Sequence, residues 1–211
     1  MPRQAFREAT EFFLHTLSQV PGEAWASPGL GEWSVRDLVG HTSRSFVTLE
    51  AYAGKLGSSI DLNAPDLHAP VDYFLAVRGT LADPSSVAQR GREAGQELGE
   101  HPVALVEATA KRVSSLVEGL ADDVILTTPV GGMRLIDYLP TRIFELTVHT
   151  LDVAQATDLQ ALDLIMEPPP APLLVTLHLL ADLAVATGAG PDLALAVTGR
   201  LSLPQGFSVL G

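Results

Sequence analysis

The amino-acid sequence predicts a mainly α-helical protein, a four-helix bundle with a short α/β appendage at its C-terminal end. Apolar residues recur at helical spacing over four long segments. Proline, glycine and polar residues separate these segments, so the connections can turn the chain back on itself. With 211 residues, the chain is long enough for one such domain with a sizeable core and for an appendage.

The first three bundle helices are predicted from their apolar stripes and from their ends. The first runs from about Pro2 to Val20, where Pro21 and Gly22 stop it. The second begins after Ser34, because Ser34 followed three residues later by Asp37 is a capping box. The third covers about residues 103–120.

Weaker patterns lie between the second and third helices. A loop is expected over about 58–70, a helical piece over 70–81, and a marginal helix or mobile connection over 84–101. Three glycines recur at every fourth position of that last segment: Gly91, Gly95 and Gly99. In a membrane helix this spacing would favour close packing, but the segment is too polar for that reading. Gly40, in the second helix, costs about 1 kcal/mol relative to alanine, which hints that something there needs room.

The fourth helix follows a connection over 122–133, in which the pair Gly131-Gly132 indicates a short strand or hairpin turn. Asp137 is predicted to cap this helix. Pro140 would then lie in the first turn, where a missing backbone donor is harmless. The helix and the bundle domain are expected to end near residue 158.

One face of the fourth helix is polar. At about 100° per residue, five side chains fall within a strip about 80° wide: Tyr138, Arg142, Glu145, His149 and Asp152. Glu145 and His149 are four residues apart, so they lie one turn apart on the same face and could bind one divalent metal ion. The residues alone leave two readings open. The strip is either a metal site or a solvated face in which Arg142 and Glu145 form an exposed ion pair.

His41 is the other candidate ligand, and it lies beside the apolar stripe of the second helix. A single histidine there is either a packed core residue or a ligand. The remaining histidines show no ligand spacing: His15, His68, His101 and His178.

The character of the chain changes after residue 158, so we expect residues 1–158 to form the bundle and 159–211 a C-terminal extension. Three consecutive prolines at 168–170 form a stiff spacer. A helix over about 171–187 and a strand over 193–201 are predicted to follow. This extension is expected to dock on the bundle or to form a homodimer contact.

The composition excludes several functions. Hydrophobic residues at 46% and charged residues at 18% are typical of soluble globular proteins. A net charge of −12 without any basic run argues against nucleic acids and anionic membranes as partners. The chain has no cysteine, so disulfides, zinc–thiolate sites and a cysteine nucleophile are excluded, and any thiol must come from outside. The charged N-terminus is unlike a signal peptide, and a cytoplasmic protein is expected.

Two segments together carry a resemblance to a known family: residues 33–41, Trp-Ser-Val-Arg-Asp-Leu-Val-Gly-His, and residues 142–152, Arg-Ile-Phe-Glu-Leu-Thr-Val-His-Thr-Leu-Asp. In this order, they resemble the mycothiol-dependent maleylpyruvate isomerase family of the DinB-like metal-binding four-helix-bundle superfamily. Residues 197–204 resemble a piece of the sterol-carrier-like C-terminal domain of the isomerase.

This resemblance implies that His41, Glu145 and His149 bind zinc or another divalent metal. Two imidazoles and one carboxylate leave a coordination position open, and mycothiol or a similar small thiol would be the co-substrate. Arg142 could pair with Glu145 or with a substrate carboxylate, and Tyr138 could donate a hydrogen bond near the site.

Other polar residues have open roles. Asp152 could orient His149 or be an exposed charge, and Asp37 could orient His41 or only cap its helix. Arg200 could serve an anionic small-molecule substrate. The leading hypothesis is a zinc- and thiol-dependent transferase or isomerase. The alternatives are a metal-dependent hydrolase and a non-catalytic small-molecule-binding or stress-related module.

Overall fold

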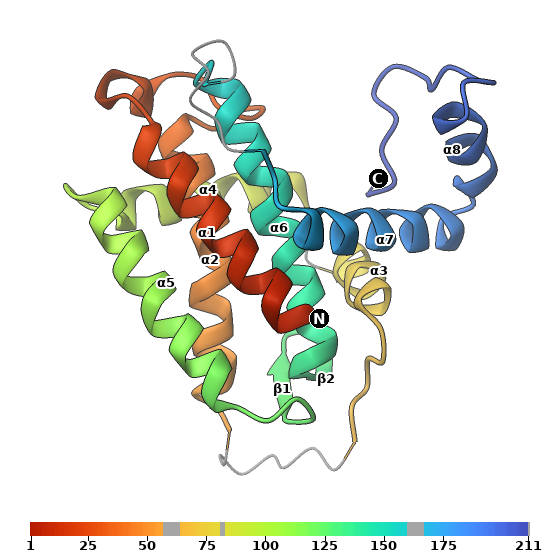
Figure 1. Cartoon of the computed structure of the whole chain (residues 1–211), viewed down its shortest axis with the longest axis horizontal. Helices are drawn as coiled ribbons and strands as arrows, with labels where there is room; N and C mark the ends of the chain where they lie inside the picture. Colours follow the sequence, from red (N-terminus) through yellow and green to blue (C-terminus); the bar gives the residue numbers. More distant parts are fainter. Residues whose placement is uncertain (57–63, 81–82, 160–166, 211) are drawn as a thin grey trace.

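The computed structural model describes residues 1–56, 64–80, 83–159 and 167–210, and it confirms the mainly helical fold class. Four long helices form a bundle (Figure 1): α1 (Pro2–Gln19), α2 (Val35–Ala53), α5 (Pro102–Gly119) and α6 (Leu135–Ala156). Helices α1 and α6 run in one direction, and α2 and α5 run in the opposite direction. Both α1 and α2 pack against α5 and α6, so each of the four predicted bundle helices is present.

The core between these helices is built from the apolar stripes. The Phe46 ring of α2 lies 6.3 Å from the rings of both Phe6 and Phe13 of α1. All three side chains are buried, as are Leu38 on α2 and Leu139 on α6. Burial of such side chains contributes about 1.5–3 kcal/mol each, which fixes the helices that carry the polar residues.

The long connection from α2 to α5 lets these two helices run parallel. It contains α3 (Pro70–Thr80) and α4 (Pro84–Glu97), and the short 3-10 helix η1 (Gly22–Ala26) lies between α1 and α2. Part of the predicted loop over 58–70 lies outside the described residues. The capping box of α2 is confirmed, because Ser34 Oγ accepts a hydrogen bond from Asp37 N and the Asp37 carboxylate accepts one from Ser34 N.

Of the two readings of residues 84–101, a marginal helix or a mobile connection, the structure has the helix. Most of this segment is α4, which packs closely on α2. A Cβ atom added to Gly40 would lie 2.6 Å from the Cα of Gly95, and one added to Gly91 would meet the Trp33 ring. Two of the three spaced glycines, Gly91 and Gly95, therefore do mark close packing, whereas an added Cβ at Gly99 would meet nothing within 4 Å.

The predicted start of the fourth helix is also wrong. Helix α6 begins at Leu135, directly after a hairpin of β1 (Ile125–Thr128) and β2 (Gly131–Arg134). The backbone N–H groups of Leu135 and Ile136 donate to carbonyl groups of the chain just before β1, so no side-chain cap is needed. Pro140 consequently lies inside the helix, and Asp137 pairs with Arg134 at 2.5 Å instead of capping. The short strand expected at Gly131-Gly132 is confirmed, since both glycines lie in β2, whereas the turn of the hairpin lies at Pro129 and Val130.

The described part of the C-terminal extension contains two helices, followed by a segment over 198–210 without regular secondary structure. Helix α7 (Pro170–Ala186) packs across α1 and α6, which confirms docking on the bundle. The strand expected over 193–201 is wrong, because α8 (Gly190–Val197) occupies most of it. A lone strand would leave its backbone groups unpaired, whereas a helix pairs them locally. Among the described residues, no helix combines the length and apolar character needed to cross a membrane.

Candidate metal centre

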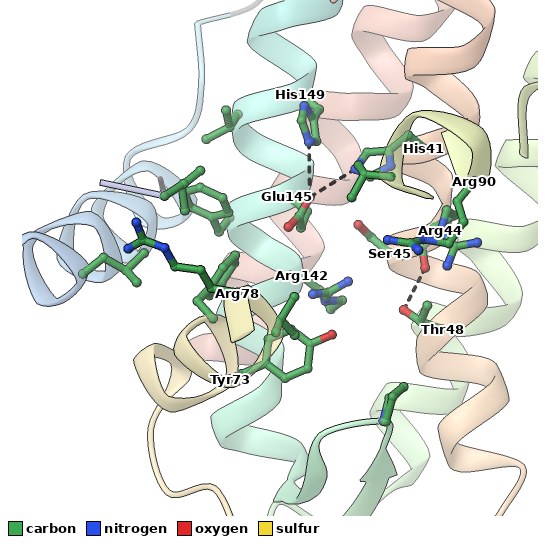
Figure 2. Close-up of a pocket in the computed structure, with 18 of the residues that line it drawn as sticks. His41, Arg44, Ser45, Thr48, Tyr73, Arg78, Arg90, Arg142, Glu145 and His149 are labelled. Carbon is green, nitrogen blue, oxygen red and sulfur yellow. Dashed lines mark hydrogen bonds and ion pairs between the residues drawn. The ribbon is translucent and has the colours of Figure 1, made fainter. Parts of the chain in front are cut away.

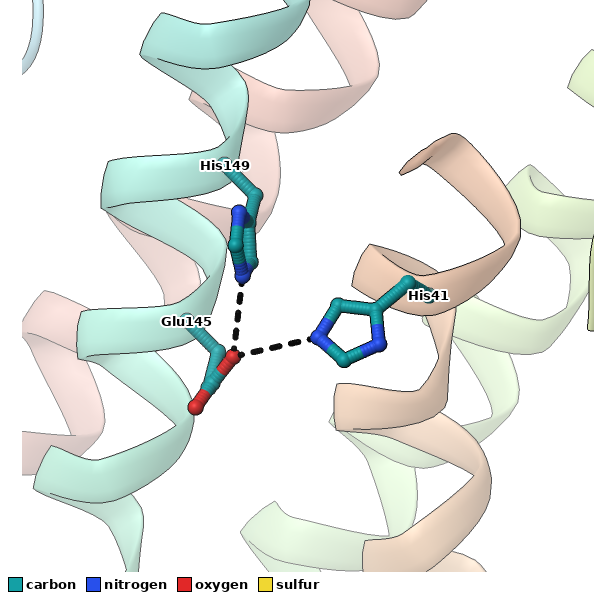
Figure 3. Close-up of side chains that lie close together, drawn as sticks. All are labelled: His41, Glu145 and His149. Carbon is teal, nitrogen blue, oxygen red and sulfur yellow. Dashed lines mark ion pairs between the residues drawn. The ribbon is translucent and has the colours of Figure 1, made fainter. Parts of the chain in front are cut away.

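Two antiparallel helices of the bundle aim the three predicted metal ligands at one another (Figure 2 and, closer, Figure 3). His149 Nε2 lies 3.2 Å from Glu145 Oε2, and His41 Nε2 lies 3.7 Å from the same oxygen. One donor atom from each residue can be chosen so that all three lie within 4.8 Å of one another. The polar strip of α6 therefore faces α2, and the reading as a solvated face is wrong for this part of the strip.

The donor set fits a divalent metal ion. Two imidazole nitrogens and one carboxylate oxygen are ligands of catalytic zinc sites, which keep a further position for water or substrate. The side chains of His41 and Glu145 are each 20% exposed and that of His149 is 14% exposed, so the group is shielded but can be reached. These three residues could hold a metal ion.

Asp152 orients His149. The Nδ1 atom of His149 lies 2.9 Å from Asp152 Oδ2, so Nδ1–H donates to the carboxylate and Nε2 faces Glu145 and His41. Burial alone would lower the pKa of His149, but the hydrogen bonds to Asp152 and Glu145 raise it to about 9. Without a metal ion, His149 is therefore an imidazolium at neutral pH. A metal ion would have to displace its proton.

The other two ligands have pKa values that suit this arrangement. Burial would raise the pKa of Glu145, but hydrogen bonds from His149 and His41 hold it well below its ordinary value. Burial lowers the pKa of His41, against the opposing effect of Glu145. His41 is therefore a neutral imidazole beside an ionised carboxylate, and both are in the protonation state that metal binding requires.

Trp33 holds the His41 ring, a role that the sequence reading missed. The two rings have centroids 4.5 Å apart, and the indole Nε1 donates to the backbone carbonyl of Ala88 at 2.9 Å. His41 Nδ1 is buried without a hydrogen-bond partner in the described part of the chain, since Asp37 is occupied in the capping box. Stacking therefore replaces the hydrogen bond that would otherwise fix this ring.

Arg142 lies one turn before Glu145, is only 7% exposed and lines the same cavity. Its guanidinium carbon lies 4.9 Å from the centre of the Tyr138 ring and 5.4 Å from that of Tyr73, in the range of cation–π contacts. Tyr138 is fully buried against Arg142 and does not line the cavity. Burial raises the pKa of its hydroxyl, so Tyr138 is a neutral phenol. The catalytic roles expected for both residues remain predictions.

The metal-site residues form part of the wall of a cavity of about 600 Å³. Residues of α2, α3, α4, α6 and α7 line it, together with the C-terminal segment (Figure 2). Three further arginines lie there that the sequence reading missed: Arg44, Arg78 and Arg90. The spacing His41-x-x-Arg44 was the available signal for Arg44, whereas Arg78 and Arg90 lie on α3 and α4, away from the candidate ligands in sequence. Arg200 does not line the cavity and donates to the nearby Thr198 carbonyl at 3.3 Å.

Comparison with known proteins gives one match. A family model described as the mycothiol maleylpyruvate isomerase N-terminal domain matches residues 6–154. The matched region contains most of α1 and α6 and all of α2, and thus all three candidate ligands. Searches of curated proteins and of solved structures returned no match.

Proposed function

Because the chain belongs to the mycothiol maleylpyruvate isomerase N-terminal domain family, we propose that it is a metal-dependent enzyme that uses a small thiol as co-substrate. The thiol is mycothiol or a close analogue, and the reaction is thiol transfer or cis–trans isomerisation. One observation carries this proposal. His41, Glu145 and His149 converge from two helices on the wall of a cavity of about 600 Å³, which has room for a thiol and a second substrate.

The proposed division of labour follows from the ligand set. When bound, zinc or another divalent ion would supply a Lewis acid that keeps the co-substrate sulfur in its nucleophilic thiolate form. Glu145 contributes negative charge, and the two imidazoles contribute neutral donors. Asp152 and Trp33 hold the two rings in place, so the ligands need little rearrangement on binding.

The thiol chemistry places the nucleophile on the co-substrate. The chain has no cysteine, so no protein thiol competes for the metal ion or for the electrophile. In a transfer, the sulfur forms a bond to an electrophilic carbon and a leaving group departs with its electron pair. In an isomerisation, the sulfur adds to a conjugated double bond, the resulting single bond rotates, and the same thiolate departs.

Metal analysis followed by a thiol screen tests the proposal. Elemental analysis of wild type should give about one equivalent of metal, and His41→Ala and His149→Ala should each hold less than about a tenth of that. The metal-loaded protein should then consume an electrophile only when mycothiol or another small thiol is present. Turnover without any thiol would favour a metal-dependent hydrolase. A wild-type protein purified without chelator that binds no metal would refute the proposed enzyme.

A further inference from the structure

The cavity that contains the candidate metal centre also contains a group of arginines. Arg44 follows His41 by three residues on α2, and Arg142 precedes Glu145 by three residues on α6. Helices α2 and α6 are antiparallel, so three residues forward on α2 and three residues backward on α6 lead in the same direction. Both arginines therefore lie about 4.5 Å from the candidate ligands along the helix axes, on the same side. Figure 2 shows the two side chains on the same side of the metal-site residues.

Three of the cavity arginines have no carboxylate partner among the described residues: Arg44, Arg78 and Arg142. Within the described ranges of the chain, the one side-chain hydrogen bond of Arg142 runs from Nε to the Thr141 hydroxyl. Some arginines outside the cavity do pair with a carboxylate, for example Arg112 with Glu50 at 2.5 Å. A buried guanidinium group that forms no ion pair with a carboxylate can donate its remaining N–H groups to an anion in the cavity.

The charge of the cavity opposes that of the whole protein. The chain carries 25 acidic and 13 basic residues, yet four arginines line the cavity and Glu145 is the only carboxylate among its described lining residues. A metal ion would neutralise Glu145. The cavity therefore attracts anions even though the net charge of −12 repels them elsewhere.

Another part of the cavity lining is apolar. We call it the apolar wall, and its members come from α3, α6, α7 and the C-terminal segment: Phe74, Phe144, Val148, Leu183 and Val209. Phe144 and Val209 are buried in one hydrophobic cluster with Leu183. Val148 lies directly before His149, so the apolar wall begins next to the metal centre. A small, fully polar anion would leave this wall without a partner.

We propose that the second substrate is an amphipathic anion, with a carboxylate or phosphate head between Arg44 and Arg142 and an apolar body against the apolar wall. This inference rests on the proposed function, since it names the substrate class for the same site. The head would lie about one helical turn from the metal centre, and the reacting carbon would lie between the head and the body. Arg142, which contacts two adjacent tyrosine rings, positions the head without large side-chain rearrangement.

Calorimetric titration with four simple probes tests the proposal on the protein as purified. Octanoate and octyl phosphate each combine an anionic head with an apolar body, octan-1-ol lacks the charge, and succinate lacks the apolar body. The two amphipathic anions should bind at least tenfold more tightly than octan-1-ol and succinate. The tighter of the two identifies the preferred head. Octan-1-ol or succinate binding as tightly as octanoate would overturn the proposal.

Variants locate the head. Arg44→Gln should weaken octanoate binding about tenfold and leave octan-1-ol binding within about twofold. Arg142→Gln should act in the same direction, and Arg142→Lys, which keeps the charge in the buried site, should retain part of the affinity. Arg112→Gln, which removes an equal charge outside the cavity, is the matched control and should have no effect. Unchanged octanoate affinity in a folded Arg44→Gln protein would refute the assignment.

Removing the metal separates this inference from the proposed function. The titrations should be repeated after chelation and on His149→Ala. Octanoate binding that persists there, and still depends on Arg44, supports the anion site even if no thiol reaction is ever found. Octanoate binding that disappears with the metal would mean that the metal holds the head. That result would overturn the arginine site while leaving the metal centre intact.

Discussion

The substitution Gly40→Ala tests the packing that positions His41. Intrinsic helix propensity predicts that alanine stabilises α2 by about 1 kcal/mol. The structure predicts the opposite sign, because the new Cβ would lie 2.5 Å from the carbonyl carbon of Ala94 and 2.6 Å from the Cα of Gly95. The backbone N of Gly95 would lie closer still, and ordinary contacts start at 3.4 Å, so α2 and α4 would have to separate by about 1.1 Å.

The size of the effect follows from the kind of atoms in contact. Backbone atoms of α4 cannot rotate away as a flexible side chain could, so the cost lies near the upper end of the roughly 1–3 kcal/mol for overpacking. After the gain in propensity is subtracted, Gly40→Ala should lower the free energy of unfolding by about 2 kcal/mol, measured by urea denaturation. Zinc affinity should fall as well, since His41 is the next residue.

Gly119→Ala is the matched control, because Gly119 ends α5 and no atom lies within 4 Å of the position of its added Cβ. It should leave stability unchanged or raise it by up to about 1 kcal/mol. Gly95→Ala probes the same helix contact from the other side and should be destabilising, since its Cβ would lie 2.6 Å from Asp37 Oδ1. If Gly40→Ala proved more stable than wild type, the close approach of α2 and α4 would be refuted.

The other predictions concern the site. Zinc affinity, measured by chelator competition, should rise about tenfold per pH unit from pH 7 and level off above about pH 9. The reason is that His149 must lose its proton to bind the metal ion. An affinity that does not change with pH would contradict the raised pKa of His149. In the metal-free protein, the pKa of His149 in the folded state lies above its ordinary value of 6.5. The contribution of His149 to the free energy of unfolding is therefore complete below about pH 6.5 and is lost as the pH rises through about 9. Urea denaturation at several pH values checks this. Asp152→Asn should weaken zinc binding about 10–100-fold without changing the stoichiometry at saturation, and an unchanged Kd would count against the orienting role. Tyr138→Phe should leave the free energy of unfolding within about 1 kcal/mol of wild type, because the buried hydroxyl has no hydrogen-bond partner among the described residues; a larger loss in urea denaturation would reveal a missing partner.

Much of the fold could be predicted because it depends on neighbours in sequence. The capping box at Ser34 and Asp37 was correct, since a cap is formed within one turn. The short strand at Gly131-Gly132 was also correct, although the turn of the hairpin lies just before it, at Pro129 and Val130. The start of α6 was misplaced by three residues because carbonyl groups of the chain just before β1, rather than a cap, accept the hydrogen bonds of its first N–H groups.

The α4 segment shows the limit of pattern reading. Its polar residues face solvent, and its glycines face α2, so neither feature resembles an ordinary apolar stripe. The glycines lower the helix propensity of α4 while allowing its backbone to approach Gly40. Likewise, the β-branched and leucine-rich pattern after residue 190 favours a strand, but no partner strand exists among the described residues of the tail.

The sequence by itself determined the ligand types and their spacing on each helix. A period of 3.6 residues necessarily places Glu145 and His149 on one face, wherever that face points. Only the tertiary structure decided that this face meets His41, that Trp33 stacks on His41, and that arginines from separate helices line one cavity. The physical reason is that helix periodicity is a local property of the backbone. The direction in which a helix face points is instead set by packing between residues about a hundred positions apart.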